Sequence, residues 1–104
     1  MRRGEVWWAQ LPPPSGRRPV VLLSRDAAYR VRSAVTVAPV TTTIRDIPVE
    51  VVLDEDDGLP RRCVVNADDI ATIPKDLLRS RLAVLSRDKL LAVEVAIRFS
   101  LALD

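Results

Sequence analysis

Up to residue 85, the chain alternates between short apolar runs and polar segments rich in proline and charged side chains. Apolar runs of this length, separated by turn-forming residues, are typical of β-strands. They predict strands over residues 3–11, 19–24, 35–40, 47–53, 63–67 and 82–85. The polar, mixed segment 25–33 predicts a short helical turn around residues 27–29. Residues 74–78, which begin with Pro74, predict one more helical turn.

The strand at 19–24 is the most apolar of these. Its residues 20–23 are Val, Val, Leu and Leu, so we expect it to be buried on both faces. Pro19 cannot donate a ladder hydrogen bond and is expected at the first position of the strand. Arg17 and Arg18 would then stand where a core strand emerges from a loop, and guanidinium groups suit the recognition of phosphate.

A helix is predicted from residue 87 onward. Ser86 is a good N-cap, and Asp88 lies in the first turn, where the helix dipole favours a negative charge. Glu94 and Arg98 are four residues apart and are expected to pair. The apolar surface is wider than one buried face requires, so part of it is expected to pack on a second subunit. This surface comprises Leu90, Leu91, Val93, Ala96, Ile97, Leu101 and Leu103.

Several short strands followed by one helix predict a single small, barrel-like α+β domain over residues 1–104. No apolar run is long enough to span a membrane, and the start of the chain lacks the apolar stretch of a signal peptide. The single Cys63 excludes an internal disulfide and suits a reducing compartment. We therefore expect a cytoplasmic protein.

The composition narrows the possible chemistry. There is no histidine and one cysteine, which excludes Ser-His-Asp triads, histidine-based metal sites and zinc clusters. The acidic run at 54–58 is interpreted as a solvated turn, because hard cations need ligands at defined spacing. We therefore expect no metal or cofactor. The net charge is +2 and most cations are arginines, which fits phosphate binding and fits a GC-rich coding bias equally well.

Four segments resemble, in the same order, the MazF/PemK (Kid) toxins of bacterial toxin–antitoxin systems. They are Arg-Gly-Glu-Val-Trp at 3–7, Arg-Pro-Val-Val-Leu-Leu-Ser at 18–24, Val-Ala-Pro-Val-Thr-Thr-Thr at 37–43 and Val-Val-Asn-Ala-Asp at 64–68. The resemblance implies a small twisted antiparallel β-barrel similar to CcdB, with a C-terminal α-helix, that forms a homodimer. It also implies a metal-independent endoribonuclease that cuts single-stranded messenger RNA at short sequences and is blocked by a cognate antitoxin protein.

The resemblance also assigns catalytic residues. Arg18 matches the catalytic arginine before the strand proline, Thr41 matches the catalytic threonine, and Asp68 falls where some members use an acidic residue. The implied reaction is attack of a ribose 2′-hydroxyl on the adjacent phosphate, with loss of a 5′-hydroxyl. Arg18 would stabilise the phosphorane oxygens and Thr41 would donate a hydrogen bond. Asp68 is the candidate base, because arginine, with a pKa above about 12, is a poor one.

Other polar side chains are candidates for binding RNA, including Asn66, which stands where the Kid toxin has an arginine. The expected RNA-binding residues are Arg17, Arg25, Thr42, Arg45 and Asn66. Trp7 and Trp8 could stack on bases, but the favoured interpretation places one in the core and the other at a rim or dimer interface. The loop before Arg17 lacks a Ser-Glu-Gln-Gly-Gly-like insert that is usual in relatives, which predicts a more open site and an altered RNA preference.

Two other functions remain open at this point. A CcdB-like toxin would share the fold and bind a protein target without cutting nucleic acid. A catalytically inactive barrel would bind RNA or an antitoxin and do no chemistry. The presence of both Arg18 and Thr41 favours the endoribonuclease.

Overall fold

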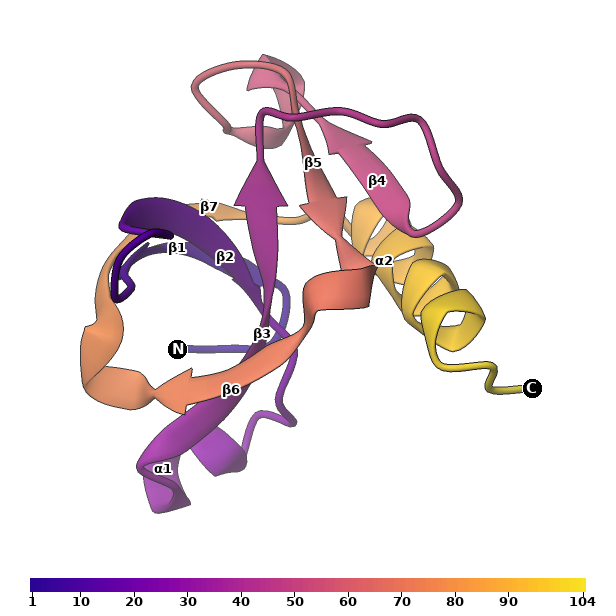
Figure 1. Cartoon of the computed structure of the whole chain (residues 1–104). Coiled ribbons are helices and arrows are strands. Elements are labelled where there is room, and N and C mark those ends of the chain that lie inside the picture. The colour runs from indigo at the N-terminus through magenta and orange to yellow at the C-terminus, as the bar shows by residue number, and fades with distance from the viewer.

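The computed structural model describes all 104 residues as seven antiparallel strands followed by a helix (Figure 1). The strands are β1 (Glu5–Gln10), β2 (Arg17–Leu22), β3 (Ala34–Thr41), β4 (Glu50–Leu53), β5 (Cys63–Asn66), β6 (Ala71–Pro74) and β7 (Leu78–Val84). The α-helices are α1 (Ala28–Val31) and α2 (Arg87–Ser100). Three short 3₁₀ turns are η1 (Glu55–Asp57), η2 (Ala67–Asp69) and η3 (Lys75–Leu77).

Strand β3 connects the two halves of the sheet. The strand order is β4-β5-β3-β2-β1-β7, and β6 also pairs with β3. On one edge β3 pairs with β2. On the other edge it pairs with β6 from Ala34 to Val37 and then with β5 at Val40 and Thr41. Pro39, which has no N–H to donate, lies between these two ladders. The neighbour of β3 on this edge therefore changes between Val37 and Val40.

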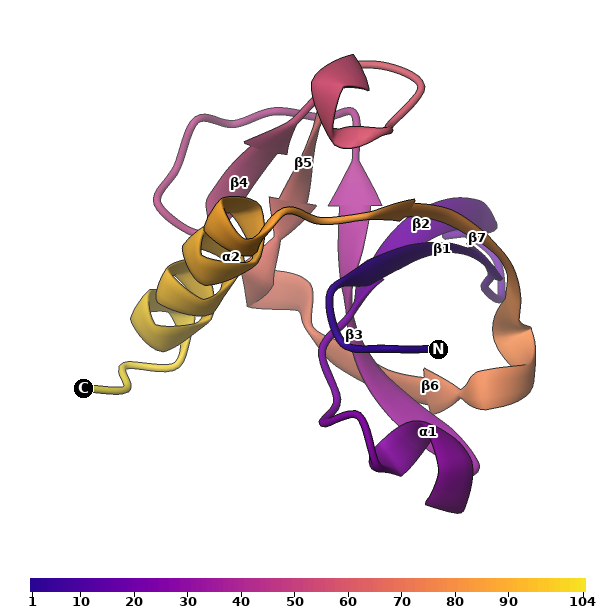
Figure 2. The ribbon, with the colours of Figure 1, turned by 180° about the vertical axis from the view of Figure 1, so that it is seen from behind.

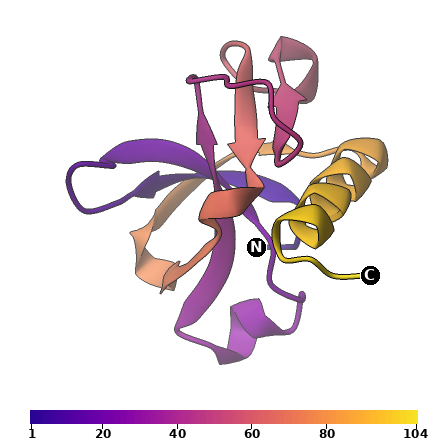
Figure 3. The ribbon, with the colours of Figure 1, turned by 45° about the vertical axis from the view of Figure 1, so that its right-hand side comes forward.

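Strands β7, β1, β2, β3 and β6 curve into a ring (Figure 1). Turn η3 joins β6 to β7 without a ladder between them, so hydrogen bonds do not close the ring. Strands β4 and β5 extend from β3 as a wing, and α2 packs on β4 and η2 (Figures 2 and 3). The predicted α+β class with a C-terminal helix is confirmed, and the barrel is open between β6 and β7.

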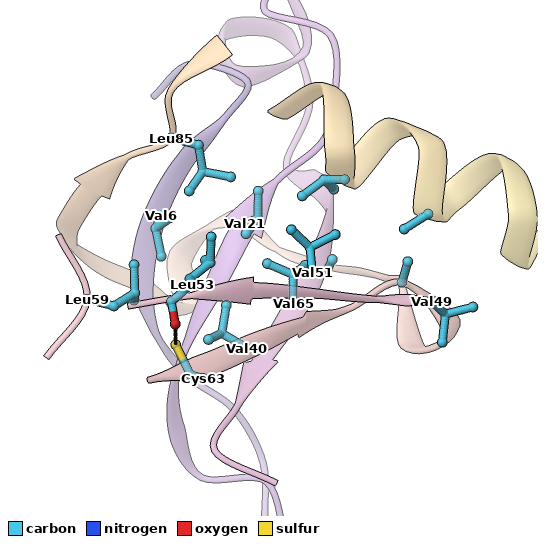
Figure 4. Packing of buried hydrophobic residues seen from close by; sticks show 14 residues of the cluster. Val6, Val21, Val40, Val49, Val51, Leu53, Leu59, Cys63, Val65 and Leu85 are labelled. Atoms are coloured by element: carbon cyan, nitrogen blue, oxygen red, sulfur yellow. Dashed lines mark hydrogen bonds between the residues drawn. The ribbon is translucent and has the colours of Figure 1, made fainter. Parts of the chain in front are cut away.

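The alternating side chains of β2 and β3 divide the core in two. One core is formed by residues of the ring and α1, namely Ala9, Val20, Leu22, Tyr29, Val35, Val37 and Leu78. The other joins ring, wing and α2 and includes Val6, Val21, Leu53, Val65 and Val93 (Figure 4). Strand β2 contributes to both cores, which confirms that it is buried on both faces. Each such buried side chain contributes about 1.5–3 kcal/mol.

Two strands begin elsewhere than the sequence indicated. Strand β2 begins at Arg17, so Pro19 is its third residue and not its first; pairing with β3 starts only at Val20. Strand β4 begins at Glu50 and not at residue 47, after Pro48, which cannot donate to a ladder.

The last part of the sheet departs further from expectation. The pattern did not predict β6. Strand β7 begins at Leu78, four residues before the predicted strand, and its residues 79–81 are exposed. An edge strand with a polar outer surface lacks the apolar run that marks a buried strand. The helical turns expected near 27–29 and 74–78 are present as α1 and η3.

Helix α2 begins as predicted. The Ser86 Oγ accepts a hydrogen bond from the Lys89 backbone N–H at 3.2 Å, which satisfies one free donor of the first turn. The expected pair between Glu94 and Arg98 is absent. The Glu94 carboxylate instead forms an ion pair with Arg3, which the ring brings against the middle of the helix.

The two faces of α2 differ. Val93 and Ala96 are buried in the core, whereas Leu91, Val95 and Phe99 are 48%, 66% and 62% exposed. The spacing of four residues places these three side chains in one stripe, defined here as the α2 stripe. The wide apolar surface predicted for the helix is therefore only partly covered. Neither helix is long and apolar enough to cross a membrane.

Candidate active site

Arg18 and Thr41 lie at the same edge of the ring. Strands β2 and β3 are antiparallel, so the beginning of one lies beside the end of the other. Arg18 is the second residue of β2, and Thr41 is the last residue of β3. Both residues line the same two cavities and so form the wall between them. The strand ends thus bring a guanidinium and a hydroxyl to one place.

The larger cavity, called here the aromatic cavity, has a volume of about 310 Å³. Besides Arg18 and Thr41, it is lined by Trp8, Arg17, Pro19, Val40, Thr42, Leu59, Pro60, Arg61 and Cys63. The Arg17 guanidinium lies over the Trp8 ring, 4.0 Å from its centroid. Such a cation–π contact contributes about 0.5–1 kcal/mol at an exposed position. It holds the indole as a flat wall of the cavity.

The smaller cavity, called here the polar cavity, has a volume of about 160 Å³. It is lined by Arg18, Pro39, Thr41, Thr43, Arg45, Asn66 and Asp69. Every side chain in this lining except that of Pro39 is polar or charged. The two cavities therefore offer different surroundings on the two sides of the Arg18–Thr41 wall.

The charge around the wall is mainly positive. Four arginines line the cavities: Arg17, Arg18, Arg45 and Arg61. None of the four forms an ion pair, because the ion pairs of the molecule involve other cations. Unneutralised guanidinium groups in a cleft attract anions and hydrogen-bond phosphate oxygens.

The loop before β2 positions Arg18. The Leu11 N–H donates to the Gly16 carbonyl at 3.0 Å, and Gly16 adopts a φ of 63°, a left-handed conformation that glycine tolerates best. The Arg18 Nε–H donates to the Ser15 carbonyl at 3.3 Å. This bond fixes the base of the guanidinium and leaves its terminal N–H groups free for a ligand.

Thr41 is held in a complementary way. Its Oγ1 accepts a hydrogen bond from the Thr43 N–H at 3.1 Å, so the hydroxyl proton remains free to be donated. The loop that follows is fixed by the Glu50 carboxylate, which accepts from the backbone N–H groups of Arg45 and Asp46, each at 2.9 Å. These bonds place the Arg45 side chain at the polar cavity.

Asn66 organises the floor of the polar cavity. It is buried, with 6% of its surface exposed, and it caps turn η2. Its Oδ1 accepts from the Asp68 N–H at 2.9 Å, and its Nδ2 donates to the Asp69 Oδ2 at 3.0 Å. The amide therefore holds the Asp69 carboxylate in place.

Cys63 lines the aromatic cavity but is not activated. Burial raises the pKa of its thiol, and the nearby carboxylates of Asp57 and Asp54 raise this pKa further. The Sγ–H points to the Leu53 carbonyl at 3.8 Å (Figure 4). A thiol kept protonated in this way is a poor nucleophile.

The cavities bring together most of the residues that the sequence singled out, namely Arg17, Arg18, Thr41, Thr42, Arg45 and Asn66. Asp68 and Arg25 line neither cavity. The Asp68 Oδ1 accepts a hydrogen bond from the Ser100 Oγ at 2.7 Å, at the end of α2. Arg25 follows the far end of β2. Trp8 lines the aromatic cavity, and Trp7 packs on the ring core.

Three further polar lining residues were not predicted as site residues. They are Thr43, Arg61 and Asp69. Arg61 lies in a polar loop between β4 and β5, and nothing in its neighbourhood marks it. Asp69 carries a weak signal, since an Asn followed three residues later by Asp suits a capped turn.

Comparison with known proteins gives a consistent assignment. Residues 2–101 match the family described as PemK-like, MazF-like toxin of type II toxin-antitoxin system. The chain is 47% identical over 97 residues to the probable endoribonuclease MazF5 of Mycobacterium tuberculosis, covering 91% of this chain and 87% of that protein.

Solved structures agree with this match. The Mycobacterium tuberculosis toxin MazF-mt6 aligns with a TM-score of 0.89 at 35% identity, covering 96% of this chain and 98% of that one. An endoribonuclease in complex with its cognate antitoxin, from a mycobacterial species, aligns with a TM-score of 0.87 at 30% identity, covering 100% and 97%. The chain therefore belongs to the PemK-like, MazF-like family of toxins from type II toxin–antitoxin systems.

Proposed function

We propose that this toxin is a metal-independent endoribonuclease that cleaves single-stranded messenger RNA by attack of a ribose 2′-hydroxyl on the scissile phosphate. One observation carries the proposal. Arg18, which no carboxylate neutralises, and the Thr41 hydroxyl share the wall between two cavities. A phosphate bound at this wall would have one cavity on each side.

The chemistry follows from the two donors. As charge builds on the phosphorane, the terminal N–H groups of Arg18 hydrogen-bond its nonbridging oxygens in bidentate fashion. Thr41 donates its hydroxyl proton to the same phosphate, because Thr43 already occupies one lone pair of its oxygen. Removing one preorganised donor of this kind raises a barrier by about 2.7–4 kcal/mol.

The cavities also account for a single-stranded substrate. An unstacked base fits against the flat Trp8 wall of the aromatic cavity, and such bases are available only outside a duplex. Arg17, Thr42, Arg45 and Asn66 would contact the RNA near the wall. Arg25, beyond the far end of β2, would contact it only outside the two cavities.

The partners follow from the family and from the exposed surfaces. A solved relative is an endoribonuclease in complex with its cognate antitoxin. The basic cavities of this chain suit an acidic antitoxin segment that would block RNA, and the exposed α2 stripe suits a second copy in a homodimer. We place the toxin in the cytoplasm, where messenger RNA is translated.

Incubating the purified protein with single-stranded RNA in EDTA tests the function. The wild type is expected to cut, leaving a 2′,3′-cyclic phosphate and a 5′-hydroxyl, and Arg18→Ala is expected to cut on the order of 10²- to 10³-fold more slowly. Arg87→Ala is the matched control, because Arg87 is exposed at the start of α2, away from both cavities. Growth arrest without any RNA cleavage would instead favour a CcdB-like, protein-binding toxin.

A further inference from the structure

The two cavities contain many proton donors and very few groups that could accept a proton. Their titratable lining consists of four arginines, Cys63 and one carboxylate, that of Asp69. The chain has no histidine, and no lysine lines either cavity. Arginine stays protonated, and the Cys63 thiol is occupied with the Leu53 carbonyl. Attack by a 2′-hydroxyl needs a proton acceptor. Among the lining residues, only the Asp69 carboxylate remains as a candidate for this role.

One side-chain hydrogen bond orients Asp69. The Asn66 amide, itself buried, donates to the Oδ2 of Asp69 at 3.0 Å. No side chain or backbone group of the molecule occupies the other carboxylate oxygen, Oδ1. Asp69 therefore presents one oriented, unoccupied oxygen at a cavity that Arg18 and Thr41 also line.

The neighbouring carboxylate is directed elsewhere. Asp68 and Asp69 are consecutive in the 3₁₀ turn η2, where successive side chains point about 120° apart. The Asp68 Oδ1 is held by the Ser100 Oγ of α2 at 2.7 Å. Asp68 thus fastens the turn to the helix, while Asp69 faces the cavity.

We propose that Asp69 is the general base of RNA cleavage, a role that rests on the proposed function. Its carboxylate takes the proton of the 2′-hydroxyl while the 2′-oxygen forms a bond to phosphorus. The bond from phosphorus to the 5′-oxygen breaks, and that oxygen takes a proton from water. The hydroxide that remains takes the proton from Asp69, which restores the carboxylate. The products are a 2′,3′-cyclic phosphate and a 5′-hydroxyl, and Arg18 and Thr41 hold the nonbridging oxygens throughout.

Single-turnover cleavage of a short RNA by Asp69→Asn tests the role. The variant keeps the shape and the contact with Asn66, and the rate is expected to fall on the order of 10²- to 10⁴-fold. Affinity for the same RNA with a 2′-deoxyribose at the cleavage position is expected to change by less than about threefold, since the base acts on the 2′-hydroxyl that this analogue lacks. A large loss of affinity would assign Asp69 to binding and overturn the proposal.

A second substrate separates a base from an acid. Replacing the 5′-oxygen of the scissile bond by sulfur gives a leaving group that needs no proton. This substrate restores the rate of a variant that lacks a general acid and leaves a variant that lacks a general base slow. Asp69→Asn is expected to remain slow on it, and restoration would overturn the proposal.

Two further variants complete the test. Asp69→Glu keeps a carboxylate and is expected to recover part of the lost rate. If Asp68→Asn instead shows the large loss while Asp69→Asn cleaves within about threefold of wild type, the base is Asp68. Suppose that the wild type and Asp69→Asn both cleave RNA and that Arg18→Ala does not. The role of Asp69 is then wrong, and the proposed function stands. If the wild type does not cleave RNA, the proposed function itself fails.

Discussion

Tyr29 is the only tyrosine of the chain, and it closes one end of the ring core. Its hydroxyl donates to the Ser24 carbonyl at 3.0 Å. Burial, and then the charge of Asp26, raises the pKa of Tyr29 to about 12. An unfolded tyrosine titrates near pH 10. The stabilisation from the protonated phenol is therefore complete below about pH 10 and is lost as the pH rises through about 12.

This linkage predicts the behaviour of Tyr29→Phe. Between about pH 10 and pH 12, the Tm of the wild type should fall more steeply than that of the variant, which has no phenol to ionise. At neutral pH the variant should be less stable by about 0.5–1.5 kcal/mol, because it lacks the bond to Ser24. Thermal melts at a series of pH values measure both effects. Parallel slopes for the two proteins above pH 10 would contradict the pKa assigned to Tyr29.

Individual site residues differ in how far the sequence reveals them. Arg18 was predicted from its place before an apolar strand, and Thr41 from its match to the family's catalytic threonine. The structure brings the two together because antiparallel neighbours place the start of one strand beside the end of the next. Which of Asp68 and Asp69 lines the polar cavity could not be predicted, because this depends on the direction of side chains in a turn and on a contact with Ser100 far along the chain. Arg61 could not be predicted as a lining residue, because it lies in a loop without a periodic pattern of apolar residues.

Helix α2 depends on its cap. The Ser86 Oγ accepts a hydrogen bond from the Lys89 N–H, and Ser86→Ala removes that acceptor. The variant should lose about 1 kcal/mol of unfolding free energy, measured by urea denaturation. Ser33→Ala is the control, because the Ser33 hydroxyl makes no hydrogen bond, and it should stay within about 0.5 kcal/mol of wild type. Equal losses in both variants would argue against a stabilising cap.

Elements buried on at least one face were easier to predict than edge elements. Strand β2 was predicted from its apolar run, and helix α2 from its N-cap and its many apolar residues. Strand β6 is short and ends at Pro74, and β7 exposes residues 79–81, so neither shows the expected pattern over its full length. The pair of Arg3 with Glu94 could not be read locally, because it joins the two ends of the chain.

The molecule as a whole should bind RNA through several phosphate contacts. For single strands, the logarithm of affinity falls with the logarithm of salt concentration by about 0.7 per contact. If Arg17 contributes one contact, Arg17→Gln should reduce this slope by about 0.7. Binding titrations at several salt concentrations measure the slope, with a 2′-deoxyribose at the cleavage position to prevent cutting. Arg87→Gln should leave the slope unchanged, and equal slopes for Arg17→Gln and wild type would exclude a phosphate contact by Arg17.

The overall architecture was predictable in class but not in detail. Alternating strands and one helix indicated a small α+β barrel. The division into ring and wing depends on β3 exchanging β6 for β5 between Val37 and Val40, and the local sequence does not show which strands β3 pairs with.

That exchange has a consequence for how such toxins diversify. Thr41 ends a strand that contributes to both cores, and Arg18 is the second residue of the strand beside it, whereas Arg45 and Arg61 lie in connecting loops. Substitutions in those loops leave the buried framework intact. Substitutions in these loops can therefore change the RNA sequence preference among related toxins, while the cleavage reaction stays the same.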